Sequence, residues 1–456
     1  MPKTIPQFLC TECGETLPKW MGKCPSCGEW NTIKEFRESK TKSFSTRSNA
    51  VTGSDLTIRD KKKESILHSN ERIPSGIEEV DRVIGSGFFP GSLVLFGGSP
   101  GVGKSTLALQ IFLKLKKAFY FSGEESSEQV FQRAERIQKQ PIELAEKKIF
   151  STNSLEDIIQ TIESQKPDVA VIDSIQMVGL EGSQLGQISQ LRENAEVLLR
   201  LAKSTGTAIL LIGHVTKSEE LAGPKILEHI VDTVLYLEGE RNSELRILRT
   251  SKNRFGSTFE VGVFEMTSKG LKELQNPSEF FLSERADKAT GSAITVVREG
   301  ARNFLLEIQT LTVKTNFGQP RRTSHGIDLS KMHLLLAVIS KFTPFKSEMF
   351  DAYINVVNGF RIRETSADLA VVAAFLSSLT DTEIPADTII LGEVGLSGEI
   401  RSVPHLESRL SEAEKLGFKR AIVPRIKTEK FQSKTLQIQS VKSIQELMKE
   451  LFGKKN

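Results

Sequence analysis

The sequence predicts an α/β protein whose largest part is a mainly parallel β-sheet flanked by helices. Apolar strand-like runs alternate with amphipathic helical patterns over residues 71–275, and a glycine-rich loop joins one such strand to one such helix. Helical patterns between successive strands favour right-handed parallel crossovers. The candidate strands are Leu93–Gly97, Phe119–Ser122, Asp168–Ile172, Ala208–Ile212, Thr233–Leu237 and Leu245–Arg249.

The length of 456 residues is too great for one core and predicts two or three domains. Residues 1–33 hold all four cysteines and both tryptophans. Residues 34–70 are polar and lack periodicity, so we expect a flexible linker there. The α/β domain is expected over 71–275 and a second, α+β domain over 276–456. Expected elements of the second domain are the strands Ser292–Val297 and Phe304–Val313 and the helices Leu329–Ser340, Ala367–Ser378 and Leu406–Leu416, the last stopped by Gly417.

The net charge of +4 neither indicates nor excludes nucleic-acid binding, because basic residues can cluster locally. The sequence contains no run of 18 apolar residues and no apolar signal-peptide core near its start. We therefore expect a cytoplasmic protein that does not enter a membrane.

Two cysteine pairs near the start have the spacing of a metal site. Cys10 and Cys13 form one pair, Cys24 and Cys27 the other, with ten residues between the pairs. Four thiolates favour tetrahedral Zn²⁺ and leave no open position, so the predicted role is structural. A redox role for the CxxC pairs is the open alternative.

Residues 98–105 fit the phosphate-binding loop pattern G-x-x-x-x-G-K-[ST] in full, between a predicted strand and the helical run Thr106–Lys116. Backbone N–H groups and the helix N-terminus would hold the phosphates of ATP. We expect Lys104 to reach the β and γ phosphates and Ser105 to ligate Mg²⁺. The nucleotide-binding residues are predicted to be Gly98, Ser99, Pro100, Gly101, Val102, Gly103, Lys104, Ser105 and Thr106, with His214 as a further candidate.

Three more positions are candidates for the hydrolysis chemistry. Asp173 closes a buried strand and would hold Mg²⁺ through water, although it can also simply cap a helix. Glu124 and Glu125 both follow a strand, and we favour Glu124 as the base because it is nearer the strand end; helix N-terminal carboxylates are the alternative. His214 ends the next strand, where it can sense the γ-phosphate or serve as a structural histidine.

Taken together, the sequence resembles the bacterial RadA (Sms) recombination and repair family over nearly its whole length. The resemblance is carried by the four-cysteine module, Ser-Gly-Glu-Glu-Ser at 122–126, Asp-Ser-Ile-Gln at 173–176, Gly-Pro-Lys-Ile-Leu-Glu-His at 223–229 and Lys-Asn-Arg-Phe-Gly at 252–256. It implies a RecA-like ATPase core in a hexameric ring, which binds single-stranded DNA, drives branch migration of recombination intermediates, and acts with the strand-exchange protein RecA.

Two sets of basic residues acquire expected roles in such a ring. Lys217 and Lys225 lie on a loop that would face a central DNA channel, with a solvated surface charge as the alternative. Lys252 and Arg254 are two apart on an extended segment, so both point to one face and would complete a neighbouring subunit's site. Direct binding of DNA phosphates is the alternative for this pair.

The C-terminal region resembles the peptidase domain of Lon over Glu364–Ala370, Gly392–Arg401 and Leu406–Pro424. Ser366 falls at the nucleophile position and Glu407 at the position of the Lon lysine. Without a lysine, Ser366 is a weak nucleophile, so we expect a non-proteolytic scaffold. The competing functions are therefore an ATP-dependent protease, against which Glu407 argues, and a nucleotide-switched scaffold like the circadian RecA-like ATPases.

Overall fold

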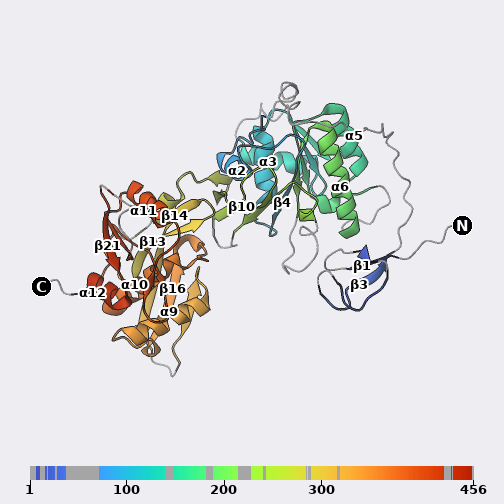
Figure 1. Ribbon diagram of the computed structural model, residues 1–456. Helices are drawn as coiled ribbons and strands as arrows, with labels where there is room; N and C mark the ends of the chain where they lie inside the picture. Colours follow the sequence, from blue (N-terminus) through green and yellow to red (C-terminus); the bar gives the residue numbers. More distant parts are fainter. Residues whose placement is uncertain are drawn as a thin grey trace, which may run out of the picture. The chain divides into compact units, whose positions relative to one another are not determined.

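A computed structural model describes residues 7–10, 16–17, 19–25, 28–36, 71–138, 147–180, 188–213, 227–239, 243–283, 285, 289–315, 319–425, 433 and 435–453. The chain forms two compact units (Figure 1). The first comprises Met1–Glu238, Leu248–Thr258 and Thr267–Leu271; the second comprises Gly239–Ile247, Phe259–Met266 and Lys272–Asn456. The chain passes between the units several times, because β10 (Leu245–Asn253) and β11 (Val261–Thr267) each have residues in both.

The first unit is built on parallel strands in the order β9-β4-β8-β7-β5-β6, which confirms the predicted mainly parallel sheet. Strands β10, β11 and β12 follow in sheet order beyond β9. The bounds are β4 (Leu93–Gly98), β5 (Ala118–Ser122), β6 (Lys148–Ser151), β7 (Val169–Asp173), β8 (Ala208–Ile212), β9 (Thr233–Glu238) and β12 (Gly270–Glu273). Strands β4, β5, β7 and β8 are buried along their whole length, as expected for a sheet covered on both faces.

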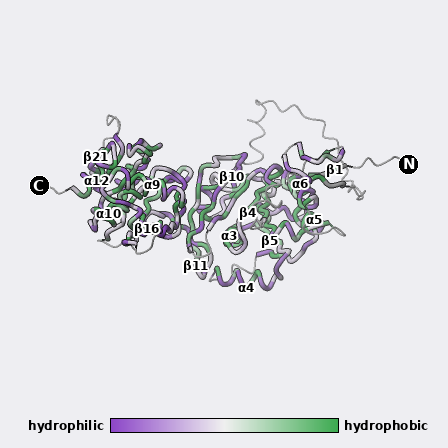
Figure 2. Tube along the Cα trace, turned by 90° about the horizontal axis from the view of Figure 1, so that it is seen from below, coloured by the Kyte–Doolittle hydropathy of each residue, from purple (hydrophilic) through white to green (hydrophobic). Residues whose placement is uncertain are grey.

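Side-chain alternation along β5 shows how helices cover both faces of this sheet. Phe119 and Phe121 pack in a cluster with α5 (Leu155–Gln165) and α6 (Ile188–Thr205). Tyr120 points the other way and meets Phe112 of α3 (Lys104–Lys114), with ring centroids 5.6 Å apart. Figure 2 shows hydrophobic residues concentrated in the central strands such as β4. The remaining helices of this unit are α2 (Glu78–Ile84) and α4 (Ser127–Ile137).

The second unit contains a seven-stranded sheet in the order β15-β16-β14-β13-β17-β20-β21. Its strands are β13 (Ser292–Glu299), β14 (Arg302–Lys314), β15 (Arg322–His325), β16 (Phe350–Val356), β17 (Thr388–Ile390), β20 (Arg420–Pro424) and β21 (Gln437–Val441); β18 (Glu393–Val394) and β19 (Ile400–Arg401) pair separately. Its helices are α8 (Pro277–Leu282), α9 (Leu329–Phe342), α10 (Asp368–Thr380), α11 (Leu406–Lys415) and α12 (Ile444–Phe452). Helices α9, α10 and α12 share one core and α11 packs in another, so the sheet is covered on both faces.

The N-terminal module is a three-stranded antiparallel sheet in the order β2-β1-β3, made of β1 (Gln7–Cys10), β2 (Thr16–Leu17) and β3 (Ile33–Phe36). Its register pairs Cys10 with Ile33. Within the described parts of the chain, no helix has the length and apolar character needed to cross a membrane.

Two boundaries differ from the sequence-based expectation in ways that affect the site. Helix α3 begins at Lys104 rather than Thr106, so the lysine and serine of the loop pattern belong to its first turn. Strand β10 continues to Asn253, so Lys252 lies inside the strand instead of after it. The chain just beyond β10 contacts the residue that precedes β9, because Arg254 donates its backbone N–H to the carbonyl of Asp232.

Candidate nucleotide site and zinc module

The phosphate loop connects the buried strand β4 to α3. A Cβ built on Gly98 would lie 2.6 Å from the carbonyl oxygen of Leu237, so no larger residue fits at the start of the loop. Gly103 precedes α3 with φ +112° and has no side chain to cap the helix. The first-turn N–H groups, with half-buried Ser105 and Thr106 among them, therefore face the loop and fit a phosphate.

Lys104 lies inside this loop and is buried. Its Nζ donates to the carbonyl oxygens of Gly98 (2.9 Å) and Ser99 (3.1 Å). Burial lowers the pKa of Lys104 to about 8, and the nearby carboxylates of Asp173 and Glu124 partly oppose that shift. A buried cation beside two carboxylates, at a helix N-terminus, is an arrangement suited to phosphate groups.

Asp173 ends β7 and is buried. Its Oδ2 accepts a hydrogen bond from the hydroxyl of Tyr120 at 2.5 Å. Burial, together with the adjacent Asp173, raises the pKa of Tyr120 well above its ordinary value, so the phenol stays a donor. Tyr120 thus fixes one carboxylate oxygen of Asp173, a positioning contact that no local sequence pattern indicates.

The structure distinguishes the two glutamates that follow β5. Glu125 forms an ion pair with Arg133 at 2.6 Å. Glu124 is exposed, and its Oε1 accepts a hydrogen bond from Ser174, the residue after Asp173, at 2.5 Å. Glu124 therefore lies beside Lys104 and Asp173, whereas Glu125 is engaged elsewhere, and the geometry favours Glu124 as the base.

The described residues stop short of three predicted positions. His214, Lys217 and Lys225 lie outside the described residues. The described part of the chain is interrupted after Gly213, the residue that follows β8. Their roles stay predictions.

The basic segment at 252–256 lies at the amino-terminal ends of the parallel strands, whereas the phosphate loop of the same chain lies at their carboxyl ends. The parallel register of β4 and β9 pairs Gly98 with Leu237 at one end, while the backbone N–H of Asp232 bonds to the carbonyl of Leu93 at the other. Arg254 contacts the carboxylate of Asp232 at 3.2 Å. Gly98 is five residues along β4 from Leu93, or roughly 17 Å. Arg254 therefore cannot reach the phosphate loop of its own subunit.

Lys252 and Arg254 both contact the segment of chain that precedes β9. The Nζ of Lys252 donates to the carbonyl of Glu228 at 2.6 Å. Burial, followed by the charge of Arg254, lowers the pKa of Lys252. Phe255 stacks on Phe89 with ring centroids 4.2 Å apart, so the segment is anchored on its other side.

The described cysteines of the N-terminal module fit a metal-binding core. Cys10 and Cys24, one from each pair, are both buried and pack with Ile33. Gly28 turns the chain with φ +79°, and its N–H donates to the carbonyl of Cys24 at 2.9 Å. Cys13 and Cys27 lie outside the described residues. Thiols from the two pairs in one small core match a closed structural zinc site and not two independent redox pairs.

We expect about one zinc ion per purified chain, and its loss in Cys24→Ser. The serine hydroxyl is a poor substitute for a thiolate, and a module this small depends on its metal for folding. Metal analysis and cysteine alkylation measure the outcome. Thr32→Ala is the matched control, because it removes a hydroxyl that contacts the Cys10 sulfur at 3.2 Å and leaves every thiol in place. A metal-free protein with disulfide-linked cysteines would refute the site.

Ser366 in the second unit is buried and held in an ion-pair cluster. Its hydroxyl donates to Glu364 at 2.6 Å and accepts from Arg409 at 3.1 Å. Arg409 is buried and also binds Glu364 through both terminal nitrogens. The cation beside Ser366 is therefore Arg409, and the alignment that placed Glu407 there is corrected, because Glu407 is exposed on α11. An arginine cannot be deprotonated and does not activate a serine.

We accordingly expect no peptidase activity on unfolded proteins, with or without ATP. The Ser366 proton is directed to the carboxylate of Glu364, which Arg409 already neutralises, so Glu364 is a poor general base. A fluorogenic unfolded substrate measures the activity. ATP-dependent cleavage that disappears in Ser366→Ala would contradict the expectation.

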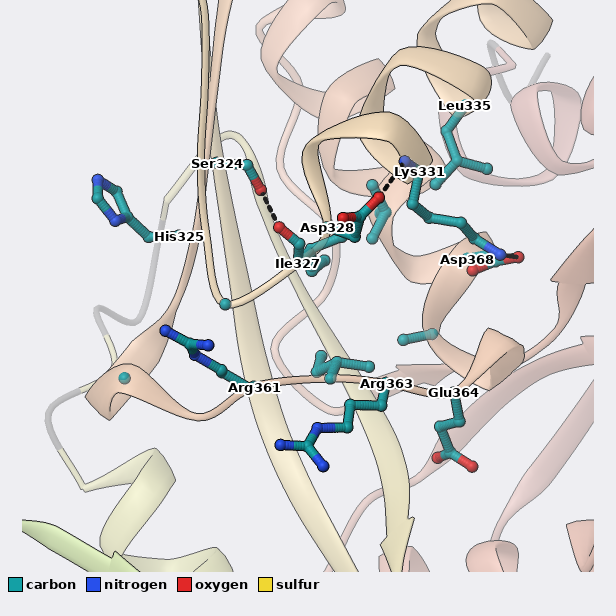
Figure 3. A pocket seen from close by; sticks show the side chains of 15 residues that line it. Ser324, His325, Ile327, Asp328, Lys331, Leu335, Arg361, Arg363, Glu364 and Asp368 are labelled. Carbon is teal, nitrogen blue, oxygen red and sulfur yellow. Dashed lines mark hydrogen bonds and ion pairs between the residues drawn. The ribbon is translucent and has the colours of Figure 1, made fainter. Parts of the chain in front are cut away.

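The second unit also has a cavity of about 640 Å³ beside this cluster. Figure 3 shows Lys331 beside the carboxylate of Asp368, and the side chains of Arg361 and Arg363 on the wall below. The Lys331 Nζ lies 2.8 Å from the Asp368 carboxylate. Burial raises the pKa of Asp368 to about 6, although Lys331 opposes the shift. Burial therefore outweighs the ion pair at this position.

This raised pKa predicts the pH dependence of stability. The protonated carboxyl of Asp368 stabilises the fold below pH 3.8, and that contribution is lost as pH rises through about 6. At pH 7.5 we therefore expect Asp368→Asn to be more stable than the native chain by on the order of 2 kcal/mol, with the difference shrinking by pH 5. Thermal unfolding at several pH values measures this. Equal destabilisation by Asp368→Asn at both pH values would show that the ion pair dominates.

The fold and the loop geometry define a P-loop ATPase, and the comparisons agree. Three family models match: the rubredoxin metal binding domain over residues 8–35, the AAA domain over 62–220, and subunit ChlI of Mg-chelatase over 337–427. The chain is thus an ATP-hydrolysing enzyme with an N-terminal zinc ribbon and a ChlI- or Lon-like C-terminal domain.

Full-length relatives carry the description "DNA repair protein RadA". The Pseudomonas aeruginosa protein is 44% identical over 99% of this chain and 100% of its own length. The Bacillus subtilis protein is 46% identical over 93% of each chain, and the Escherichia coli protein is 43% identical over 97% of each chain. The chain belongs to the RadA family of DNA repair proteins.

Proposed function

We propose that this enzyme is a DNA-stimulated ATPase that binds single-stranded DNA and drives branch migration of recombination intermediates as a homohexameric ring. In this proposal residues 1–33 form the zinc module together with the rest of β3, which ends at Phe36, so the boundary expected at residue 33 moves to 36. Residues 37–70 are a linker, 71–275 the RecA-like motor and 276–456 a non-proteolytic scaffold. RecA is the proposed protein partner, and chromosomal DNA as substrate implies a cytoplasmic location.

The observation that supports a ring most directly is the position of Lys252 and Arg254. They lie at the end of the strands opposite to the phosphate loop of their own chain, and β4 alone spans roughly 17 Å between Leu93 at that end and Gly98 at the loop. The transition state of phosphoryl transfer needs more positive charge than the phosphate loop supplies. A neighbouring subunit that presents this edge to the loop would complete the site, and a closed ring gives every subunit such a neighbour.

Each residue of the nucleotide site has a definite task in the proposed reaction. Lys104 exchanges its carbonyl contacts for phosphate oxygens and neutralises charge that develops on them. Ser105 and Asp173 would hold Mg²⁺, which neutralises phosphate charge when bound. Glu124 accepts the proton of the attacking water. Tyr120 holds Asp173 in place through its hydroxyl.

The DNA path is tested at Lys217 and Lys225, in the part of the sequence that follows β8. Lys217→Glu and Lys225→Glu are expected to weaken binding of a fluorescent single-stranded oligonucleotide and to lower the salt dependence of its affinity. Lys117→Glu is the matched control, since this exposed lysine precedes β5 at the sheet edge opposite to the phosphate loop. Unchanged affinity in both the Lys217 and the Lys225 variant would place the DNA path elsewhere.

A further inference from the structure

Two tryptophans of the N-terminal module lie on its surface. The side chains of Trp20 and Trp30 are 58% and 67% exposed. Tryptophan is highly buried on average, and its large apolar rings contribute most when they are removed from water. Two exposed indole rings on so small a module therefore form a candidate ligand-binding surface.

Hydrogen bonds hold this surface in a fixed shape. The indole N–H of Trp20 donates to the carbonyl of Ile33 at 3.0 Å. Lys23 and Trp30 face each other across an antiparallel bridge, and Asn31 donates its backbone N–H to the carbonyl of Gly22 at 2.8 Å. Because an indole has a single donor, Trp20 has its polar group satisfied and can offer a ligand only its ring.

Gly22 brings the two rings together. A Cβ built at Gly22 would lie 3.7 Å from Trp30 Cζ3 and 4.0 Å from Trp20 Cη2, so both indoles border the same backbone position. The Nζ of Lys23 lies 5.7 Å from the centroid of the Trp30 ring. Lys19 is exposed next to Trp20 in the sequence. Two neighbouring indole rings, with the Lys23 ammonium over one ring and exposed Lys19 next to the other in the sequence, suit stacked bases with phosphates alongside. The described part of the module also carries an exposed carboxylate, Glu29.

We propose that Trp20, Gly22 and Trp30 form a platform on which unpaired bases of a single DNA strand stack, with Lys19 and Lys23 beside its phosphates. This platform assigns the zinc module a direct role in strand binding, and it rests on the proposed DNA-dependent function. Stacking on aromatic rings is tolerant of sequence, which suits an enzyme that processes strands of any sequence.

Tryptophan fluorescence reports on this surface alone, because Trp20 and Trp30 are the only tryptophans in the sequence. Full-length, zinc-loaded protein is titrated with a single-stranded oligonucleotide while tryptophan fluorescence is recorded. We expect saturable quenching by the intact strand. An oligonucleotide of equal length with abasic sites, which keeps the phosphates and lacks the bases, is expected to quench far less. Equal quenching by the abasic strand would overturn the stacking assignment.

Variants measure the contribution of each ring through the anisotropy of a labelled oligonucleotide. Trp30→Ala and Trp20→Ala are each expected to weaken binding about tenfold, and Trp30→Phe is expected to lose less because it retains a ring. Gly22→Leu, which places a branched side chain between the rings, should also weaken binding. Leu396→Ala is the control, since Leu396 is as exposed as Trp30 and lies in the second unit. Zinc content and ATP turnover without DNA are expected to be unchanged in all of them.

The two proposals fail in different ways. If no oligonucleotide binds by anisotropy, the DNA-dependent function itself is wrong. If an oligonucleotide binds but tryptophan fluorescence and the affinities of Trp20→Ala and Trp30→Ala do not change, only the platform is overturned. Loss of RecA binding in those same variants, with normal DNA affinity, would overturn the platform as a DNA site and assign this face to a protein.

Discussion

Lys104→Ala is expected to lower the rate of ATP hydrolysis by about two to three orders of magnitude. Lys104 supplies the positive charge inside the phosphate loop, and burial beside Asp173 and Glu124 keeps it in position. Alanine leaves the loop backbone in place and removes the one charged side chain of residues 98–105. Steady-state phosphate release measures the effect.

The fold is expected to survive this substitution. The Nζ of Lys104 bonds to two loop carbonyls near solvent-accessible Ser99, so water can replace it there. Lys114→Ala is the matched control, because this lysine is exposed at the other end of the same helix. Near-normal turnover in Lys104→Ala would show that residues 98–105 are not the hydrolytic site.

Lys252→Ala is expected to abolish most ATP turnover on its own and to regain it in rings mixed with Lys104→Ala subunits. In a mixed ring, an intact Lys252 from one subunit meets an intact Lys104 of the next, which restores some complete sites. Lys252 is the cleaner substitution, since within the described parts of the chain its Nζ bonds to backbone carbonyls, those of Glu228 and His229. Turnover measured against mixing ratio gives the result.

Arg254 needs a more conservative variant. Arg254→Ala would remove a partner of the buried Asp232 and destabilise the sheet edge as well as the proposed active site. Arg254→Lys keeps the charge but loses the planar fork, so it separates charge from geometry. If basal turnover is normal in Lys252→Ala and only DNA-stimulated turnover is lost, the pair binds DNA phosphates and the trans role is wrong.

The parts of the fold that follow from local sequence were predictable. The apolar runs that became β4, β5, β7 and β8 have nearly the predicted bounds, because a strand buried on both faces must be apolar throughout. The phosphate loop is contiguous in sequence, so its geometry is fixed by its own glycines.

Contacts between distant parts of the chain were not predictable. Arg409 meets Ser366 across 43 residues, and Tyr120 meets Asp173 across 53. No local pattern indicates such pairs; only the packing of α11 and the pairing of β5 with β7 bring them together. Glu407 and Arg409 are two positions apart on α11, which is a rotation of about 200° around the helix, so a two-residue misalignment is enough to put exposed Glu407 in the place of the buried neighbour of Ser366.

Coupling of ATP hydrolysis to single-stranded DNA is the central claim, and one paired measurement tests it. ATP turnover is measured with and without a single-stranded oligonucleotide, in parallel with branch migration of a three-stranded intermediate. We predict that the strand raises turnover several-fold, that branch migration requires ATP, and that Lys104→Ala loses both while still binding DNA. Turnover that does not change when the oligonucleotide is bound, with no ATP-dependent branch migration, would contradict the claim and favour a nucleotide-switched scaffold.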